Sequence, residues 1–211
     1  MASQKTIYRT RKIALCALFV ALVAVGAFMR VPIPVVPFTF QCTFTMLAGM
    51  LLGKKLGTTS VAIYVAAGLA GIPIFTQGGG ITYVLQPTFG YLIGFIIGTF
   101  VTGWIARAVP NPSFKRLVLA GLAGLAIIYV LGTIYCGLIT RYYLGKAVDV
   151  GKLILSCMVL VAPGDLALLV LGCFVAKRLI PICDRICGIS AMCASASEES
   201  DEEHVNSDTE I

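Results

Sequence analysis

The sequence predicts an all-α membrane protein, a bundle of six transmembrane helices with folded or re-entrant outer loops. Hydrophobic residues make up 58% of the 211 residues and charged residues only 12%, against about 25% charged in soluble domains. The apolar residues also form long blocks of the kind that span a hydrocarbon core about 30 Å thick. Taken in order, these blocks are 13–29, 38–53, 57–72, 91–109, 117–139 and 153–180.

The distribution of positive charge predicts the orientation of this bundle. Lys and Arg are retained on the cytoplasmic side of a membrane. With six helices, one side collects 12 of the 16 cations, and the other receives Arg30, Arg141, Lys146 and Lys152. We therefore expect both termini in the cytoplasm and the chain in the cytoplasmic membrane.

The last part of the chain differs in composition from the rest. Seven of the ten acidic residues lie in 198–210, which predicts a disordered acidic tail over 186–211 after a membrane-embedded domain over 1–185. Cys183, Cys187 and Cys193 cluster near the predicted cytoplasmic surface without the Cys-x-x-Cys spacing of a metal site. We expect reduced thiols and no bound metal or cofactor.

Several kinds of chemistry lack the residues they need. The single histidine, His204, lies in the acidic tail, so a His-based triad and a His-containing zinc site are excluded. The glycines at 78–80 are not followed by the lysine of a phosphate-binding loop, so ATP hydrolysis would need separate subunits. The sequence favours ligand capture or transport over catalysis.

Three segments assigned to the outer side combine aromatic, amide and hydroxyl side chains with few charges. They are 31–42, 73–91 and 162–165. Non-helical backbone at membrane depth is tolerated only where it is buried in protein or lines a cavity. We therefore expect a pocket for a small, largely apolar ligand, formed by residues from these segments: Thr39, Gln41, Phe75, Gln77, Gly79, Tyr83, Gln86, Thr88 and Tyr91.

Asp165 is the one acidic residue among the apolar blocks. If Pro163 opens a helix, Asp165 occupies its third position, where free backbone N–H groups favour a carboxylate. Capping of these N–H groups at the helix start would by itself account for an aspartate at this position. An ionisable group inside apolar sequence more often marks a functional site, and we favour a role in ligand binding.

These motifs together resemble the BioY family, the biotin-capturing S-components of energy-coupling factor (ECF) transporters. The resemblance rests on VPFTFQ at 36–41, LAG at 47–49 with LLG at 51–53, GIPIF at 71–75, QPTFGYLIGF at 86–95 and PGD at 163–165. The run Phe89-Gly90-Tyr91 replaces a familiar Gly-Gly-Tyr, and Leu168 stands where members often carry a lysine three residues after the aspartate.

The resemblance implies biotin uptake through an outward-facing pocket, with biotin as transported ligand rather than cofactor. It also implies docking on a membrane scaffold subunit with two ATPase subunits, through the small residues Ala17 and Ala21 of the first helix. Asp165 would accept from the ureido N–H groups. For the ligand's carboxylate, Tyr83, Lys152, Arg141 and loop backbone N–H groups remain open as donors.

Two other functions fit the same composition. The chain could act alone as a facilitator for biotin or a related vitamin. It could instead be a non-transporting membrane interaction protein that uses its small-residue faces and its acidic tail, and this reading predicts no pocket. Nothing in the sequence indicates nucleic-acid binding.

Overall fold

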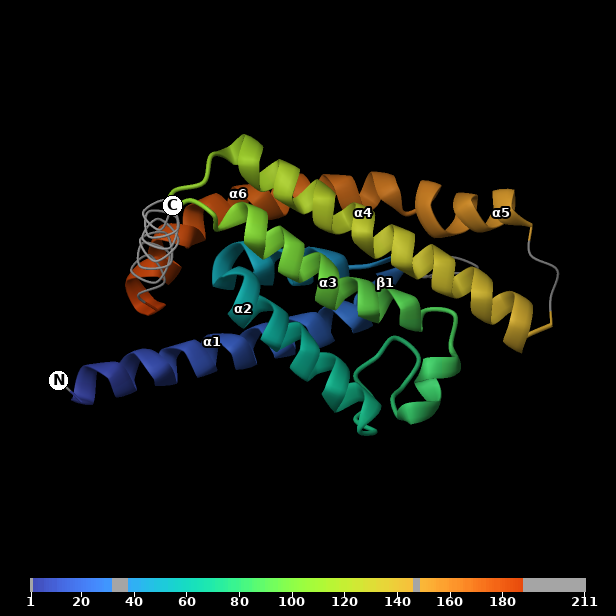
Figure 1. The fold of residues 1–211 in the computed structure, drawn as a ribbon, viewed down its shortest axis with the longest axis horizontal. Helices are drawn as coiled ribbons and strands as arrows, with labels where there is room; N and C mark the ends of the chain where they lie inside the picture. Colours follow the sequence, from blue (N-terminus) through green and yellow to red (C-terminus); the bar gives the residue numbers. More distant parts are fainter. Residues whose placement is uncertain (1, 32–37, 146–148, 188–211) are drawn as a thin grey trace, which may run out of the picture.

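The protein is an assembly of α-helices with one short pair of strands (Figure 1). The structure, a computed structural model, describes residues 2–31, 38–145 and 149–187. Two 2-residue strands, β1 (Arg30–Val31) and β2 (Phe38–Thr39), pair antiparallel with Arg30 opposite Thr39. The helices are α1 (Ala2–Phe28), α2 (Gln41–Leu69), α3 (Phe89–Ala106), α4 (Phe114–Leu138), α5 (Val150–Ile154) and α6 (Ala162–Cys187).

Three shorter helical turns complete the described chain. The 3₁₀ helix η1 (Ile81–Leu85) precedes α3, and the π-helical turns η2 (Ile139–Tyr143) and η3 (Leu155–Val159) follow α4 and α5. Residues 188–211 of the predicted tail, with Cys193, lie outside the described residues, as do the prolines between β1 and β2; residues 186 and 187 belong to the end of α6.

Helix α2 folds back on itself at Gly53. This residue has φ 78° and ψ −179°, a conformation that glycine adopts without steric cost. Beyond the bend, a Cβ at Gly57 would lie 2.7 Å from the carbonyl oxygen of Ala48, so the two halves are in close contact. Near their other ends, Gln41 donates to the hydroxyl of Tyr64 at 2.7 Å. The predicted blocks 38–53 and 57–72 thus correspond to the two halves of α2.

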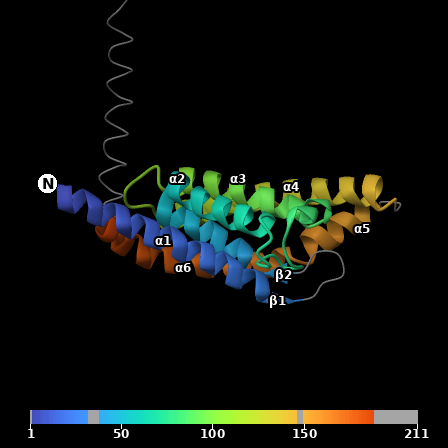
Figure 2. The ribbon, with the colours of Figure 1, turned by 90° about the horizontal axis from the view of Figure 1, so that it is seen from below.

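Small residues allow the helices to pack closely. A Cβ at Gly94 or Gly98 of α3 would lie within about 2.9 Å of the backbone of α4, and one at Gly49 would lie 2.7 Å from the carbonyl oxygen of Thr99. These glycines therefore serve packing within the molecule, because small residues let two helices approach closely. Figure 2 shows α3 and α4 on one face of the bundle, α1 and α6 on the other, and α2 between them.

The two ends of the bundle differ in structure. The start of α1, the bend of α2, the α3–α4 connection and the end of α6 share one end (Figure 1). An ion pair between Arg107 and Asp184 joins α3 to α6 there, with the two side chains 4% and 11% exposed. The strands, the 70–88 segment and α5 lie at the opposite end. The segments predicted to face outward therefore lie together.

The outer surface of the bundle is suited to lipid. Four helical segments in the described residues are long and apolar enough to cross a membrane: Thr6–Phe28, Phe89–Ala106, Phe114–Tyr143 and Cys157–Ile186. Large apolar side chains such as Trp104, Leu119 and Phe174 are more than half exposed on them. Such surfaces are unfavourable in water and favourable in hydrocarbon. The prediction of an all-α multi-pass membrane protein is confirmed.

The start of α6 differs from the expectation. We expected Pro163 to interrupt the helix before it and to place Asp165 third in the next. Instead η3 continues through a short turn into α6, which begins at Ala162, so Asp165 is fourth. Its N–H donates to the carbonyl oxygen of Val161 at 3.1 Å. A proline in the first turn of a helix costs little, because N–H groups there have no partner within the helix.

Candidate ligand-binding pocket

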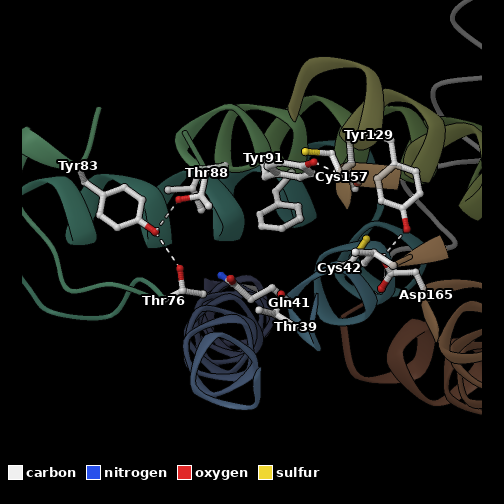
Figure 3. Close-up of a pocket in the computed structure, with 14 residues that line it drawn as sticks. Thr39, Gln41, Cys42, Thr76, Tyr83, Thr88, Tyr91, Tyr129, Cys157 and Asp165 are labelled. Atoms are coloured by element: carbon white, nitrogen blue, oxygen red, sulfur yellow. Dashed lines mark hydrogen bonds between the residues drawn. The ribbon is translucent and has the colours of Figure 1, made fainter. Parts of the chain in front are cut away.

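A cavity lies at the end of the bundle that carries the strands and the 70–88 segment. Its empty space is about 560 Å³, including the part that opens outward. Residues far apart in the sequence line it: Thr39, Gln41, Cys42, Thr76, Tyr83, Thr88, Tyr91, Leu92, Phe95, Ile128, Tyr129, Cys157, Val161 and Asp165 (Figure 3).

Asp165 and Tyr129 form the polar pair at one end of the cavity. The hydroxyl of Tyr129 donates to Oδ2 of Asp165 at 2.7 Å. The carboxylate is 3% exposed, and its Oδ1 is buried without a hydrogen-bond partner among the described residues. Leaving a buried carboxylate oxygen unsatisfied is costly, so this atom is an acceptor available to a ligand that brings a donor.

Three hydroxyl groups form a row at the other end of the cavity. The Tyr83 hydroxyl lies 2.9 Å from Oγ1 of Thr76 and 3.2 Å from Oγ1 of Thr88. Behind this row, the ring of Phe75 packs against Tyr83 and Tyr64 with centroid separations of 4.6 and 5.5 Å. Figure 3 shows the hydroxyl row and the Asp165–Tyr129 pair on opposite sides of Gln41 and Tyr91.

Gln41 and Tyr91 have fixed orientations between the two polar ends. The Gln41 amide donates to Tyr64, whose own hydroxyl donates to the carbonyl oxygen of Ile74 at 2.9 Å. This arrangement leaves Oε1 of Gln41 as an acceptor. The Tyr91 hydroxyl donates to the carbonyl oxygen of Cys157 at 3.2 Å, and its ring lies against Gly132. Side chains of Leu92, Phe95, Ile128 and Val161 complete the apolar wall.

Six of the residues expected at a pocket line this cavity, namely Thr39, Gln41, Tyr83, Thr88, Tyr91 and Asp165. The other four do not. Phe75 stands behind Tyr83, and Gly79 packs against the backbone of Ile72. Gln77 and Gln86 are exposed.

The turn geometry explains why two of the glutamines lie away from the cavity. Phe75 and Gly78 exchange backbone hydrogen bonds of 2.9 and 3.2 Å, which places Thr76 and Gln77 at the tip of a tight turn. Thr76 is directed into the cavity and Gln77 is exposed. Gln86 ends η1, where its N–H donates to the carbonyl oxygen of Tyr83.

Eight lining residues were absent from the sequence-based set: Cys42, Thr76, Leu92, Phe95, Ile128, Tyr129, Cys157 and Val161. Leu92 follows Thr88 by four residues and Phe95 follows Tyr91 by four, so the periodicity of α3 could have indicated them. Tyr129 carries a polar group in the middle of an apolar block, which was a usable signal. Cys157 lies with its sulfur 3.9 Å from that of Cys136, a proximity that no sequence pattern indicates.

The candidate residues for binding the ligand's carboxylate and for docking on a partner have the following positions. Leu168 is half-buried and does not line the cavity. Arg141 is exposed beside the Tyr142 ring, 5.9 Å from its centroid, and the side chain of Lys152 lies outside the described part of the chain. Ala17 and Ala21 are exposed on the outer face of α1.

The fold and the cavity define a class of protein: an α-helical membrane protein with a small-molecule pocket at one end of its bundle. The pocket has apolar walls and two polar ends of different chemistry, which is the usual composition of a site that fixes one orientation of a small ligand.

The chain belongs to the BioY family, which it matches over residues 1–185. It is 42% identical over 173 residues to a probable biotin transporter BioY of Lysinibacillus sphaericus, covering 82% of this chain and 88% of that one. The biotin transporter BioY of Thermotoga maritima is 41% identical over 145 residues, 67% of this chain and 82% of its own.

A solved structure supports the same relationship. It is the crystal structure of the S-component for biotin from an ECF-type ABC transporter, with a TM-score of 0.71 and 25% identity. The match covers 81% of this chain and 91% of that one.

Proposed function

We propose that this protein takes up biotin, capturing it in the cavity on the outer side of the cytoplasmic membrane and releasing it inside as the S-component of an ECF-type transporter. The observation that carries the proposal is that Asp165 lines an apolar-walled cavity and that its buried Oδ1 has no hydrogen-bond partner in the described chain. Biotin transport by relatives that match most of this chain supports it.

The chemistry of biotin complements the cavity. Its ureido group offers two N–H donors, which suit the ionised Asp165, and a carbonyl acceptor. Gln41 also lines the cavity, and its Oε1, which accepts from no described residue, is a second acceptor for a ureido N–H. The fused rings and the thioether are apolar and suit the wall that contains Tyr91 and Phe95.

The topology we propose has six crossings, with the two halves of α2 counted separately. The bend at Gly53 joins those halves at the end of the bundle where α1 begins and α6 ends. Twelve of the 16 cations belong to segments assigned to that end, which supports a cytoplasmic position for it and for both termini. The cavity at the other end then faces outward.

Docking on a membrane scaffold subunit, with two ATPase subunits, would proceed through α1. Ala17 and Ala21 are exposed there one helical turn apart, which allows a partner helix to approach closely. This assignment follows from membership of the family and from the position of α1 at the face of the bundle. The alternative, a facilitator that acts alone, would need no partner at this surface.

Uptake of radiolabelled biotin by biotin-auxotrophic cells tests the proposal and separates the two modes. We expect accumulation when the chain is expressed with a scaffold and two ATPases, and none without them. Replacing both alanines with leucine should abolish uptake while purified protein still binds biotin. Uptake in cells that lack every such partner would support the facilitator instead. Absence of both uptake and binding would refute biotin transport.

A further inference from the structure

The two polar ends of the cavity suit ligand groups of opposite kinds, hydrogen-bond donors at one end and an acidic group at the other. At one end, the Asp165 carboxylate accepts hydrogen bonds and repels a second carboxylate. At the other end, the lining residues Thr76, Tyr83 and Thr88 contribute hydroxyl groups only. Among the lining residues, Asp165 is the single carboxylic acid and no Lys or Arg occurs. A ligand with an acidic tail is therefore oriented with that tail toward the hydroxyl row.

The hydroxyl row has a hydrogen to donate. Three hydroxyl groups bring three hydrogens, and the two contacts of Tyr83 with Thr76 and Thr88 use two of them. The third can be donated to an oxygen of a ligand. One neutral donor does not balance the charge of a carboxylate in a low-dielectric site, so a cation close to this end would contribute to affinity.

Arg30 is the cation that the fold attaches to this end. Its guanidinium Nη1 donates to the carbonyl oxygen of Thr76. Its backbone pairs with Thr39 across β1 and β2. Both Thr76 and Thr39 line the cavity, so Arg30 is tied to two lining segments while its side chain stays exposed at the margin. A guanidinium carries five N–H donors, which allows it to bind a carboxylate while it keeps its bond to Thr76.

We propose that Arg30 and the hydroxyl row of Thr76, Tyr83 and Thr88 form the subsite for the ligand's carboxylate, and that Arg30 determines the preference for an acid over its neutral derivatives. This inference rests on the proposed function and deepens it. Arg30 takes the role for which the sequence had left Tyr83, Arg141, Lys152 and loop N–H groups open. The ureido ring then lies at Asp165, and the ligand extends past Gln41 and Tyr91 toward the hydroxyl row (Figure 3).

The ratio of two dissociation constants, for biotin methyl ester and for biotin, measures this preference in purified protein. The ester keeps the rings and loses only the charge. For the unchanged protein we expect the ester to bind about 10-fold or more weaker, the effect of one charge-assisted contact. Arg30→Gln should reduce the ratio to about one by weakening biotin binding alone, and Arg30→Lys should restore part of it.

Two further variants make the test specific. Arg141→Gln removes another arginine predicted on the outer side, whose side chain lies at the Tyr142 ring, and it should leave the ratio unchanged. Tyr83→Phe removes the central hydroxyl and keeps Arg30, so it should lower the ratio even if Arg30 variants fold poorly. Any of three results would overturn the assignment. They are equal binding of acid and ester by the unchanged protein, an unaltered ratio in both Arg30→Gln and Tyr83→Phe, and a lower ratio in Arg141→Gln. Biotin binding at Asp165 would survive those outcomes, whereas absence of any biotin binding would refute the proposed function itself.

Discussion

The hydroxyl of Tyr129 lies 2.7 Å from Oδ2 of Asp165, a residue that lines the cavity, and Oδ1 of the same carboxylate has no partner in the described chain. One oxygen is thus held by the protein and the other is available to a ligand. Tyr129 belongs to α4 and Asp165 to the first turn of α6, so their contact also fixes the position of two helices at the pocket.

Removing this hydrogen bond should weaken ligand binding without emptying the pocket. In Tyr129→Phe the ring stays, but Oδ2 of Asp165 loses its donor and the carboxylate is less well oriented. A hydrogen bond to a charged group contributes about 1.5–3 kcal/mol, so we expect the dissociation constant for biotin to rise about 10-fold or more. Isothermal titration calorimetry in detergent measures it. Tyr142→Phe, at a residue 78% exposed, is the control, and equal affinities in the two variants would refute the role of Tyr129.

Enlarging Gly132 should displace Tyr91 from its place in the wall. A Cβ at Gly132 would lie 2.5 Å from Cε1 of Tyr91, whose hydroxyl is held by the carbonyl oxygen of Cys157. Overpacking of this kind costs about 1–3 kcal/mol, and we expect Gly132→Ala to weaken biotin binding by about 10-fold. Gly137→Ala on the same helix meets only the Cδ2 atom of Leu153 at 3.1 Å, which can rotate away. Biotin affinity should therefore fall in the first variant and persist in the second.

The bend of α2 should depend on glycine at position 53. Its φ of 78° lies in the left-handed region, where a side chain costs about 1–2 kcal/mol. Gly53→Ala should therefore lower the midpoint of thermal unfolding in detergent. Gly172→Ala is a suitable comparison, because that glycine is helical and its nearest neighbour is Cγ2 of Thr43 at 3.6 Å. A Gly53→Ala variant as stable as Gly172→Ala would show that the halves of α2 are not joined by this bend.

The ion pair at the opposite end should contribute to stability and not to ligand binding. Asp184→Leu leaves the largely buried Arg107 without this carboxylate, and breaking a buried pair costs about 3–5 kcal/mol. We expect a clear loss of thermal stability. The double variant Arg107→Met with Asp184→Leu removes both charges and should recover much of it. If the double variant is no more stable than Asp184→Leu, the pair is not the source of the loss.

The general architecture was predictable because it depends on composition along the chain. Long apolar blocks and a biased distribution of Lys and Arg specify a membrane bundle whatever the packing details. Asp165 was recognisable for the same reason, since a carboxylate within apolar sequence is costly anywhere in a membrane protein. The residue at which α6 begins was not predictable, because a proline in the first turn of a helix is compatible with a start at Ala162 or at Pro163.

The composition of the pocket was only partly predictable, because direction and proximity are tertiary properties. Residue type alone suggested Gln77, yet the tight turn at 75–78 directs Thr76 inward and leaves Gln77 exposed. Tyr129 and Cys157 belong to helices with no loop-like feature, and they reach the cavity only because α4 packs beside α3 and η3 packs beside α4. Arg30 was assigned to the outer side as a charge, but its contact with Thr76 depends on the pairing of β1 with β2.

Equilibrium binding of biotin to the purified protein, compared between the unchanged chain and Asp165→Asn, tests the central claim most directly. Asparagine keeps the size of the side chain and replaces one carboxylate oxygen by a donor, which would face the ureido N–H groups. We expect saturable binding to the unchanged protein and a loss of about 100-fold or more in the variant, since the charge-assisted bonds are removed and an unpaired donor is introduced. No saturable binding, or equal affinity in the two proteins, would contradict the account.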